Sequence, residues 1–403
     1  MSLLPVATAR QNILSAVKTL PTEQVALDDA HLRVCAEDLR AQRTQPPFPS
    51  SAMDGYAVRH SDMAKPEHTL TVIGEAAAGH VFEGNVGAGQ AVRIFTGAPV
   101  PEGADTILIQ EDAEIIEAGS IRATEVPAKG AFIRKAGLDF NQGDVLIQAH
   151  TQLRSAHMAL LASMNMPQIP VVKKPRIGVL ATGDELVMPG EDIGPGQIVA
   201  SNNFGIAARI RELGGIPIPL GIAKDTEASL MAALEQARAA HCDAIVTLGG
   251  ASVGTHDLVQ SAFEKQGLNL NFWKIAMRPG KPLMFGNIGD MLFIGLPGNP
   301  VSSMVCTELF LVPMIRKWLG QNTELSFIKA RLTCDLRQND RREDYLRATL
   351  SPSAVDDSLP DISPFEKQDS SMLATFTKAG ALIKRAPHAP PAAKGDIVDV
   401  LLL

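Results

Sequence analysis

Aromatic residues are scarce in this chain of 403 residues, since Phe, Trp and Tyr together make up only 4% of it. The core must therefore rest on aliphatic side chains such as Leu, Ile, Val, Ala and Met. Cysteines are also few, and the four present lie far apart, without a Cys-x-x-Cys pair: Cys35, Cys242, Cys306 and Cys334. This spacing argues against disulfide staples and a thiolate zinc site, and it fits a reducing cytosol.

Basic tracts are missing as well, and the formal net charge is −7. General binding to nucleic acid or to an anionic membrane needs clustered Lys and Arg, so we expect neither partner. No stretch approaches the roughly 18 apolar residues of a membrane span. The first twenty residues lack a basic start before a long apolar run, and they predict an amphipathic helix, not a secretion signal. We therefore expect a cytoplasmic protein.

The length predicts two to four domains. Residues 5–45 predict helix, with Ile13, Val17 and Leu20 at helical spacing, and residues 153–164 predict another helix that packs beside it. From about 46 to 145, short runs rich in Val, Ile and Thr are punctuated by Gly and Pro, which indicates β-structure. We expect a helical linking domain, residues 1–45 and 146–174, with a β-rich module of residues 46–145 inserted in it.

Residues 175–325 show the alternating pattern of an α/β domain. Four short apolar runs end in Gly, at 176–183, 216–221, 244–250 and 291–298, and helix-length stretches follow at 202–213, 226–240, 257–267 and 300–319. This alternation predicts a parallel sheet covered on both faces, with ligands beyond the carboxyl ends of its strands. Residues 326–403 are strand-like with Pro-rich turns. The expected fold class is therefore α/β plus β: a central α/β sheet domain, an inserted β-rich module and a C-terminal β domain.

Two Gly-rich turns at this sheet edge are candidate ligand-binding segments. In LPGNPVSSM (296–304), Gly298 and Asn299 precede a helix that starts with Pro300. Ser302, Ser303 and the free amides of the first helical turn would cradle a phosphate, or the segment is an ordinary strand-to-helix turn.

The second turn is LGGASVGTHD (248–257). It gathers Gly249, Gly250, Ser252 and Gly254 before Asp257, at the start of a predicted helix. Glycines allow close backbone approach to a ligand, and a simple tight turn would hardly need so many small residues.

Three carboxylates also fall at this edge: Glu185 in ATGDELV, Asp225 in GIAKD, and Asp257. Each alone is more simply a solvated acidic loop or a helix cap. Converging together they would repel one another and require a cation, for which Mg²⁺ or another hard divalent ion is the economical choice.

FWKIAMRPGKPLMFG (272–286) supplies the cations Lys274, Arg278 and Lys281 around a Pro-Gly turn. In an acidic protein this cluster predicts a clamp for oxyanions, and the alternative is a solvated hairpin tip. In the inserted module, Asp54 and Thr96 are polar loop residues without an evident packing role, although both could be cap or turn residues.

Taken together, PPFPSSAMDGYAV, RIFTGAPVPEGADTILIQED, GLDFNQGDVL, LATGDEL, LGGASVGTHD, MRPGKP and LPGNPVSS resemble the molybdopterin molybdenumtransferase family (MoeA, and the E domain of gephyrin). The resemblance covers about residues 5 to 380. It implies an elongated homodimer of four-subdomain chains, with a central α/β domain of the molybdenum-cofactor-biosynthesis type. The inserted β module of the other subunit would complete the site, where molybdate and adenylylated molybdopterin react with a divalent cation and release AMP.

Carried over by motif, Asp54, Thr96, Glu185, Asp225 and Asp257 match the family's functional acidic and polar positions. The anion-binding positions match Lys274, Arg278, Ser302 and Ser303, and the C-terminal contributions match Arg347 and Ser370. Two departures stand out: Arg278 replaces a frequent lysine, which turns a point donor into a planar fork, and Gln-Asp-Ser-Ser (368–371) replaces an expected Gly-Ser pair.

Two other functions remain open. A molybdopterin adenylyltransferase resembles residues 175–320 only, and it would need neither the inserted module nor the C-terminal domain. A scaffold of the gephyrin type is a different class, disfavoured by the acidic residues on the Gly-rich loops. Partners expected from the resemblance are a second copy of the chain, the adenylyltransferase and maturation factors of molybdoenzymes.

Overall fold

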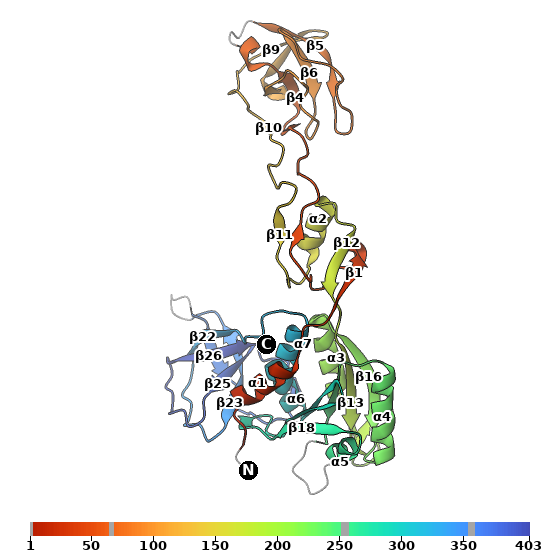
Figure 1. Ribbon diagram of the computed structural model, residues 1–403. Coiled ribbons are helices and arrows are strands. Elements are labelled where there is room, and N and C mark those ends of the chain that lie inside the picture. Colours follow the sequence, from red (N-terminus) through yellow and green to blue (C-terminus); the bar gives the residue numbers. More distant parts are fainter. Residues whose placement is uncertain (1–2, 64–67, 251–257, 354–358) are drawn as a thin grey trace. The chain divides into compact units, whose positions relative to one another are not determined.

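The computed structural model describes residues 3–63, 68–250, 258–353 and 359–403 (Figure 1). The chain divides into two compact units. The first unit contains residues 1–23, 32–36 and 171–403, and the second contains residues 24–31 and 37–170. The second unit is therefore an insertion near the N-terminal end of the first.

A six-stranded sheet of order β16-β13-β17-β21-β20-β18 forms the centre of the first unit. Its parallel strands are the four predicted ones: β13 (Arg176–Thr182), β16 (Ile216–Ala223), β17 (Ala244–Leu248) and β21 (Met291–Leu296). Two antiparallel strands, β18 (Leu268–Trp273) and β20 (Met284–Ile288), extend the sheet beyond β21. These two strands were not predicted, because the cations, Pro and Gly between them dominate the local pattern.

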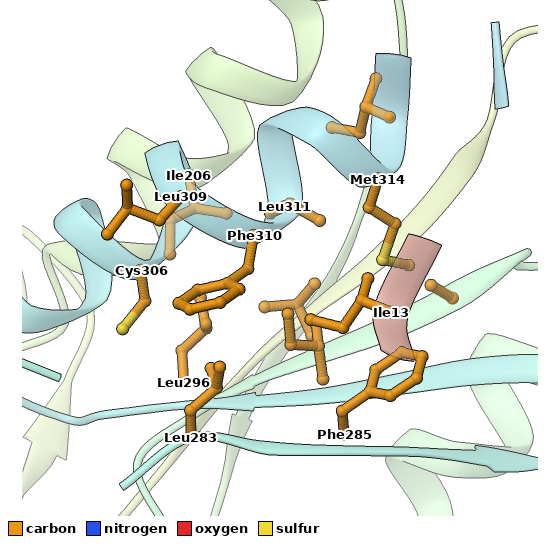
Figure 2. Packing of buried hydrophobic residues seen from close by; sticks show 14 of the residues in the cluster. Ile13, Ile206, Leu283, Phe285, Leu296, Cys306, Leu309, Phe310, Leu311 and Met314 are labelled. Atoms are coloured by element: carbon orange, nitrogen blue, oxygen red, sulfur yellow. The ribbon is translucent and has the colours of Figure 1, made fainter. Parts of the chain in front are cut away.

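Helices cover both faces of this sheet, as the continuous apolar strands predict. One face packs against α3 (Asn202–Glu212), α6 (Pro300–Cys306), a π-helical turn (Thr307–Leu311) and α7 (Val312–Trp318), and the other against α4 (Glu227–Ala239) and α5 (Leu258–Glu264). Successive residues of β17 show the division, since Val246 belongs to the first core and Ile245 to the second. Figure 2 shows the first core, where Phe310 lies over Leu283 and Leu296.

The N-terminal helix is shorter than the predicted span of 5–45. α1 ends at Ala16, and Val17 is already extended, with φ −99° and ψ 129°. Pro21 then prevents a return to helix. The chain continues through β1 (Thr22–Ala26), a 3₁₀ turn (Leu27–Asp29) and β2 (Leu39–Arg40). α1 (Val6–Ala16) packs on α7 within the first unit, instead of beside the predicted second helix, which is α2 (Ser155–Ser163) in the second unit.

The second unit is rich in β-structure, as predicted. Its six-stranded sheet has the order β7-β4-β6-β5-β9-β8. The strands are β4 (Gly55–Val58), β5 (Thr69–Ala76), β6 (Gln90–Ile94), β7 (Thr106–Ile109), β8 (Ala113–Glu117) and β9 (Ser120–Ala123). Two small antiparallel pairs accompany it: β3 (Ser50–Ser51) with β10 (Ile133–Arg134), and β2 with β11 (Val145–Ile147). The chain passes from one unit to the other within β1, within β12 (Gln168–Val172) and at both ends of residues 32–36.

The C-terminal segment closes into a barrel. Pairing runs from β23 (Glu343–Ser351) through β24 (Asp361–Pro364), β22 (Phe327–Leu332), β26 (Ile397–Leu402) and β25 (Ala381–Arg385) back to β23. A short helix, α8 (Leu373–Phe376), precedes β25. The barrel is joined to the central domain by β19 (Met277–Arg278), which pairs with the start of β23. The 272–286 segment is thus not a solvated hairpin tip, because Ile275 and Met277 are fully buried.

Candidate functional site

A cleft of about 950 Å³ opens at the carboxyl ends of the parallel strands. All four strand-to-helix turns contribute to it, as expected for an open parallel sheet. Its walls are residues 181–183, 185–186, 198–203, 225, 248–250, 258–259, 282, 297–300 and Ser371. The cleft thus belongs mainly to the central domain, and the C-terminal domain adds one residue.

Glu185 and Asp225 line this cleft together, which the sequence predicted from their places after β13 and β16. The turn around Asp225 is fixed by its backbone amide, which donates to Asp184 Oδ1 at 3.1 Å, and by Thr226, whose hydroxyl caps α4 by accepting from the Ser229 amide. Both carboxylates are exposed, and neither forms an ion pair with any residue that the structure describes. Two unpaired anionic groups in one cleft favour a cationic ligand.

The third predicted carboxylate, Asp257, lies outside the described residues, as do Ser252 and Gly254. Within the described ranges, no group of three or more His, Cys, Asp or Glu side chains is arranged to hold a metal ion. Glu185 and Asp225 therefore share the cleft, while metal binding by them and by Asp257 stays a prediction.

The Gly249–Gly250 turn has a conformation and surroundings that exclude side chains. Both residues have positive φ, +98° and +67°. A Cβ on Gly249 would lie 2.7 Å from the Thr182 carbonyl oxygen, and one on Gly250 would overlap the Cγ2 methyl of Val259. The Gly249 amide donates to the Leu296 carbonyl at 3.2 Å, which ties this turn to the end of β21. Packing within the protein thus requires glycine at both positions, and the predicted close approach of a ligand to this turn stays a prediction.

The 297–300 turn reaches the cleft through its backbone and not through its serines. Gly298 and Asn299 line the cleft, and the Asn202 amide group donates to the Gly298 carbonyl at 2.7 Å. Ser302 and Ser303 are buried and absent from the lining, and the Ser303 hydroxyl donates to the Pro300 carbonyl at 2.8 Å. The structure therefore does not bring the two predicted serine hydroxyls to the cleft.

The predicted cations Lys274, Arg278 and Lys281 do not line the cleft either. The only residue of the 272–286 segment that does is Pro282. The Lys274 ammonium sits over the Trp273 ring, 3.8 Å from its centroid. Arg278 forms ion pairs with Asp344 and, at 3.3 Å, with Asp340. The hydrogen bond to Asp344 raises the pKa of Arg278 above its usual value. Its planar fork thus fastens the 274–282 segment to the C-terminal barrel.

Arg347 and Ser370 do not line the cleft, but both contact the 368–371 loop or belong to it, and this loop contributes Ser371 to the cleft. Arg347 is buried, and its backbone amide and Nε both donate to Gln368 Oε1, at 3.0 and 3.2 Å. Burial lowers the pKa of Arg347. The Ser370 carbonyl accepts from the Val301 amide at 3.0 Å, which holds the 368–371 loop at the start of α6. Ser371, which the sequence reasoning missed, is the residue of this loop that lines the cleft.

Asp54 and Thr96 come together in the second unit. The Thr96 amide and hydroxyl both donate to Asp54 Oδ1 at 2.7 Å. These two hydrogen bonds hold the pKa of Asp54 below its usual value. The neighbouring Arg93 donates to the Gly55 carbonyl and lies over the Tyr56 ring. Thr96 thus holds Asp54 as an ionised carboxylate in a fixed position. The same contact connects two loops, which agrees with the alternative prediction that both are cap or turn residues.

Comparisons with known proteins match three successive parts of the chain. Residues 4–165 match the family described as MoeA N-terminal region (domain I and II), residues 178–317 match the probable molybdopterin binding domain, and residues 329–403 match the MoeA C-terminal region (domain IV). A molybdopterin molybdenumtransferase of Haemophilus influenzae is 41% identical over 300 residues, 74% of each chain. One of Bacillus subtilis is 36% identical over 355 residues, 86% of this chain and 82% of that protein.

The chain belongs to the MoeA family of molybdopterin molybdenumtransferases. A crystal structure of a MoeA protein of molybdopterin biosynthesis from Pyrococcus horikosii has a TM-score of 0.84 at 30% identity, covering 100% of this chain and 99% of that one. The family and the multi-domain α/β plus β fold predicted from the motifs are thus confirmed. In MoeA terms, the cleft lies almost wholly in the probable molybdopterin-binding domain, with Ser371 from domain IV. None of the described helices is long and apolar enough to cross a membrane.

Proposed function

We propose that this chain inserts molybdenum from molybdate into the dithiolene of adenylylated molybdopterin, with hydrolysis of the adenylate and release of AMP. The observation that carries the proposal is the shared cleft of Glu185, Asp225 and the Gly249–Gly250 turn. Its volume is that of a small-molecule site, and the backbone of its glycyl turns forms part of its walls. The names of the MoeA relatives support the same activity.

Glu185 and Asp225 would hold the divalent cation, with Asp257 as the predicted third ligand. The fit is supported by the chemistry of the donors, because Mg²⁺ prefers carboxylate oxygens and keeps several waters. When bound, such an ion offsets negative charge on the adenylate as its bond breaks. The two carboxylates would hold the cation at the sheet edge, while the Gly249–Gly250 turn would orient the nucleotide.

Lys274 and Lys281 would attract molybdate to the neighbourhood of the cleft. Arg278 has a different part in this proposal: its ion pairs with Asp340 and Asp344 hold the 274–282 segment in place. A point-charge lysine would not reproduce that planar contact. The sulfur ligands of molybdenum belong to the substrate, so no cysteine of the chain is required.

We further propose a homodimer in which Asp54 and Thr96 of one subunit complete the cleft of the other. The family resemblance and the ionised, hydrogen-bonded state of Asp54 support this assignment. Mixing the two inactive variants Asp54→Ala and Glu185→Ala tests it, because only a mixed dimer with shared sites regains one intact site. A mixture that stays inactive after subunit exchange would contradict sharing.

The decisive assay mixes pure protein, adenylylated molybdopterin, Mg²⁺ and molybdate, and measures AMP release and pterin-bound molybdenum. We expect both products together, and at least about a tenfold loss of rate in Glu185→Gln, since one preorganised charged group contributes on the order of 10²–10³ in rate. Equal AMP release without molybdate would instead indicate a simple hydrolase. Formation of the adenylylated pterin from ATP would indicate an adenylyltransferase.

A further inference from the structure

Arg93 of the second unit lies next to the Asp54–Thr96 contact. It belongs to β6, directly opposite Tyr56 of β4 in the antiparallel register. Its guanidinium lies over two rings, 4.9 Å from the centroid of Tyr56 and 5.0 Å from that of Phe95. Both distances are within the range of a cation–π contact. Two aromatic contacts therefore fix the place of this guanidinium on the sheet.

The nitrogens of this guanidinium are directed at the backbone that carries Asp54. Nη1 donates to the Gly55 carbonyl at 3.3 Å, and Nη2 donates to Gln110 Oε1 at 2.8 Å. The Gln110 amide in turn donates to the Asp54 carbonyl at 3.1 Å. Two separate paths of hydrogen bonds therefore join Arg93 to residues 54–55. A planar fork offers both donors at fixed positions, whereas the ammonium of a lysine is a single point.

A simpler role for Arg93 would be an ion pair across the sheet. Glu75 of β5 is its neighbour in register, but these two described residues form no ion pair with each other. The same sheet contains an arginine that does have this simpler role, since Arg122 of β9 pairs with Glu114, its register partner on β8, at 2.6 Å. Arg93 is instead turned toward the backbone of Asp54.

We propose that Arg93 is a positioning residue for the Asp54 carboxylate. This inference rests on the proposed function, in which that carboxylate completes the cleft of the partner subunit. Thr96 fixes the carboxylate itself through two hydrogen bonds of 2.7 Å, and Arg93 fixes the backbone that carries it. A carboxylate held only at its side chain would still move with its loop, and a displacement of about 1 Å can lower a rate about 100-fold.

Amide hydrogen exchange of the full chain tests the positioning without any substrate. Arg93→Lys keeps the charge but loses the fork, so the Gln110 and Thr96 amides should exchange at least about tenfold faster as the anchored backbone opens more often. The Val86 amide, hydrogen-bonded at 2.8 Å elsewhere in the second unit, should exchange as in the wild type. The matched control Arg122→Lys should leave the Gln110 and Thr96 amides unchanged.

Steady-state kinetics of molybdenum insertion give the second measurement. In Arg93→Lys, kcat should fall at least about tenfold, because the carboxylate is no longer held in its reactive position. KM for adenylylated molybdopterin should stay within about twofold, since a positioning residue does not contact the substrate. A KM that rises while kcat stays unchanged would show that Arg93 binds the substrate itself, and it overturns the proposal.

The exchange data also separate this proposal from the proposed function. Wild-type exchange at Gln110 and Thr96 in Arg93→Lys overturns the positioning role, and so does equal acceleration at Val86, which would show general loosening of the unit. Wild-type kcat in spite of faster local exchange overturns it as well. Local acceleration in Arg93→Lys, together with a wild-type protein that inserts no molybdenum, would overturn the proposed function alone.

Discussion

Replacing Gly250 by alanine tests whether the cleft turn requires glycine for two separate reasons. The first is its φ of +67°, and left-handed backbone destabilises an L-residue by about 1–2 kcal/mol. The second is steric, because the new Cβ would overlap the Cγ2 methyl of the buried Val259. Overpacking of this kind typically costs about 1–3 kcal/mol, so Gly250→Ala should lower the free energy of unfolding by about 2–5 kcal/mol.

Two further variants separate these contributions. Gly190 has a φ of +90°, but a Cβ there would meet nothing within 4 Å. Gly190→Ala should therefore lose only the backbone part, about 1–2 kcal/mol. Val259→Ala removes the clashing methyl, so in the double variant with Gly250→Ala the two effects should be non-additive, with a favourable coupling of about 0.5–3 kcal/mol.

Urea unfolding followed by tryptophan fluorescence measures these differences in unfolding free energy for the first unit of the chain, which contains the cleft. The only two tryptophans of the sequence, Trp273 and Trp318, both belong to the first unit, so the signal reports unfolding of the unit that contains the cleft. Equal losses in Gly250→Ala and Gly190→Ala, or strict additivity in the double variant, would refute the steric part of the reasoning.

Two other predictions concern the second unit and the first core. Since Thr96 holds the pKa of Asp54 low, this contact stabilises the fold above the usual carboxyl pKa and is lost as the pH falls through the lowered value. Thr96→Val removes one of its two donors, so an NMR titration should give a higher Asp54 pKa, and an unchanged pKa would contradict the assignment. Phe310→Ala should reduce the unfolding free energy by about 3–5 kcal/mol in the same urea assay, because the ring is fully buried; a loss below about 1 kcal/mol would show that the core in Figure 2 is loosely packed.

The parallel strands could be predicted from the sequence because they carry a strong local signal. Runs such as IGVLA within RIGVLAT and MLFIGL are apolar, and strands buried on both faces need that composition. The end of α1 was harder to predict. Val17 and Leu20 keep helical spacing and still pack against the core, although the backbone has left the helix. Spacing alone does not separate the two cases.

For the site as well, features set by local sequence could be predicted, whereas contacts with distant residues could not. The position of Glu185 and Asp225 after neighbouring strands was enough to predict that both line one cleft, because parallel topology brings strand ends to one edge. By contrast, nothing local indicates that Arg278 is engaged by Asp344, a residue 66 positions later in another domain. Likewise, the burial of Ser303 follows from the packing of α6, which the motif alone does not reveal.

Metal binding at Glu185 and Asp225 is the claim on which the account depends most, and titration with Mn²⁺ followed by EPR measures it directly. Mn²⁺ shares the preference of Mg²⁺ for oxygen ligands. We expect one site per chain, weakened at least about tenfold in Glu185→Gln and in Asp225→Asn, because each removes a charged ligand. Asp192→Asn, which neutralises an exposed carboxylate outside the cleft lining, should leave the affinity unchanged. Wild-type affinity in both Glu185→Gln and Asp225→Asn would contradict a cation held by the carboxylates of this sheet edge.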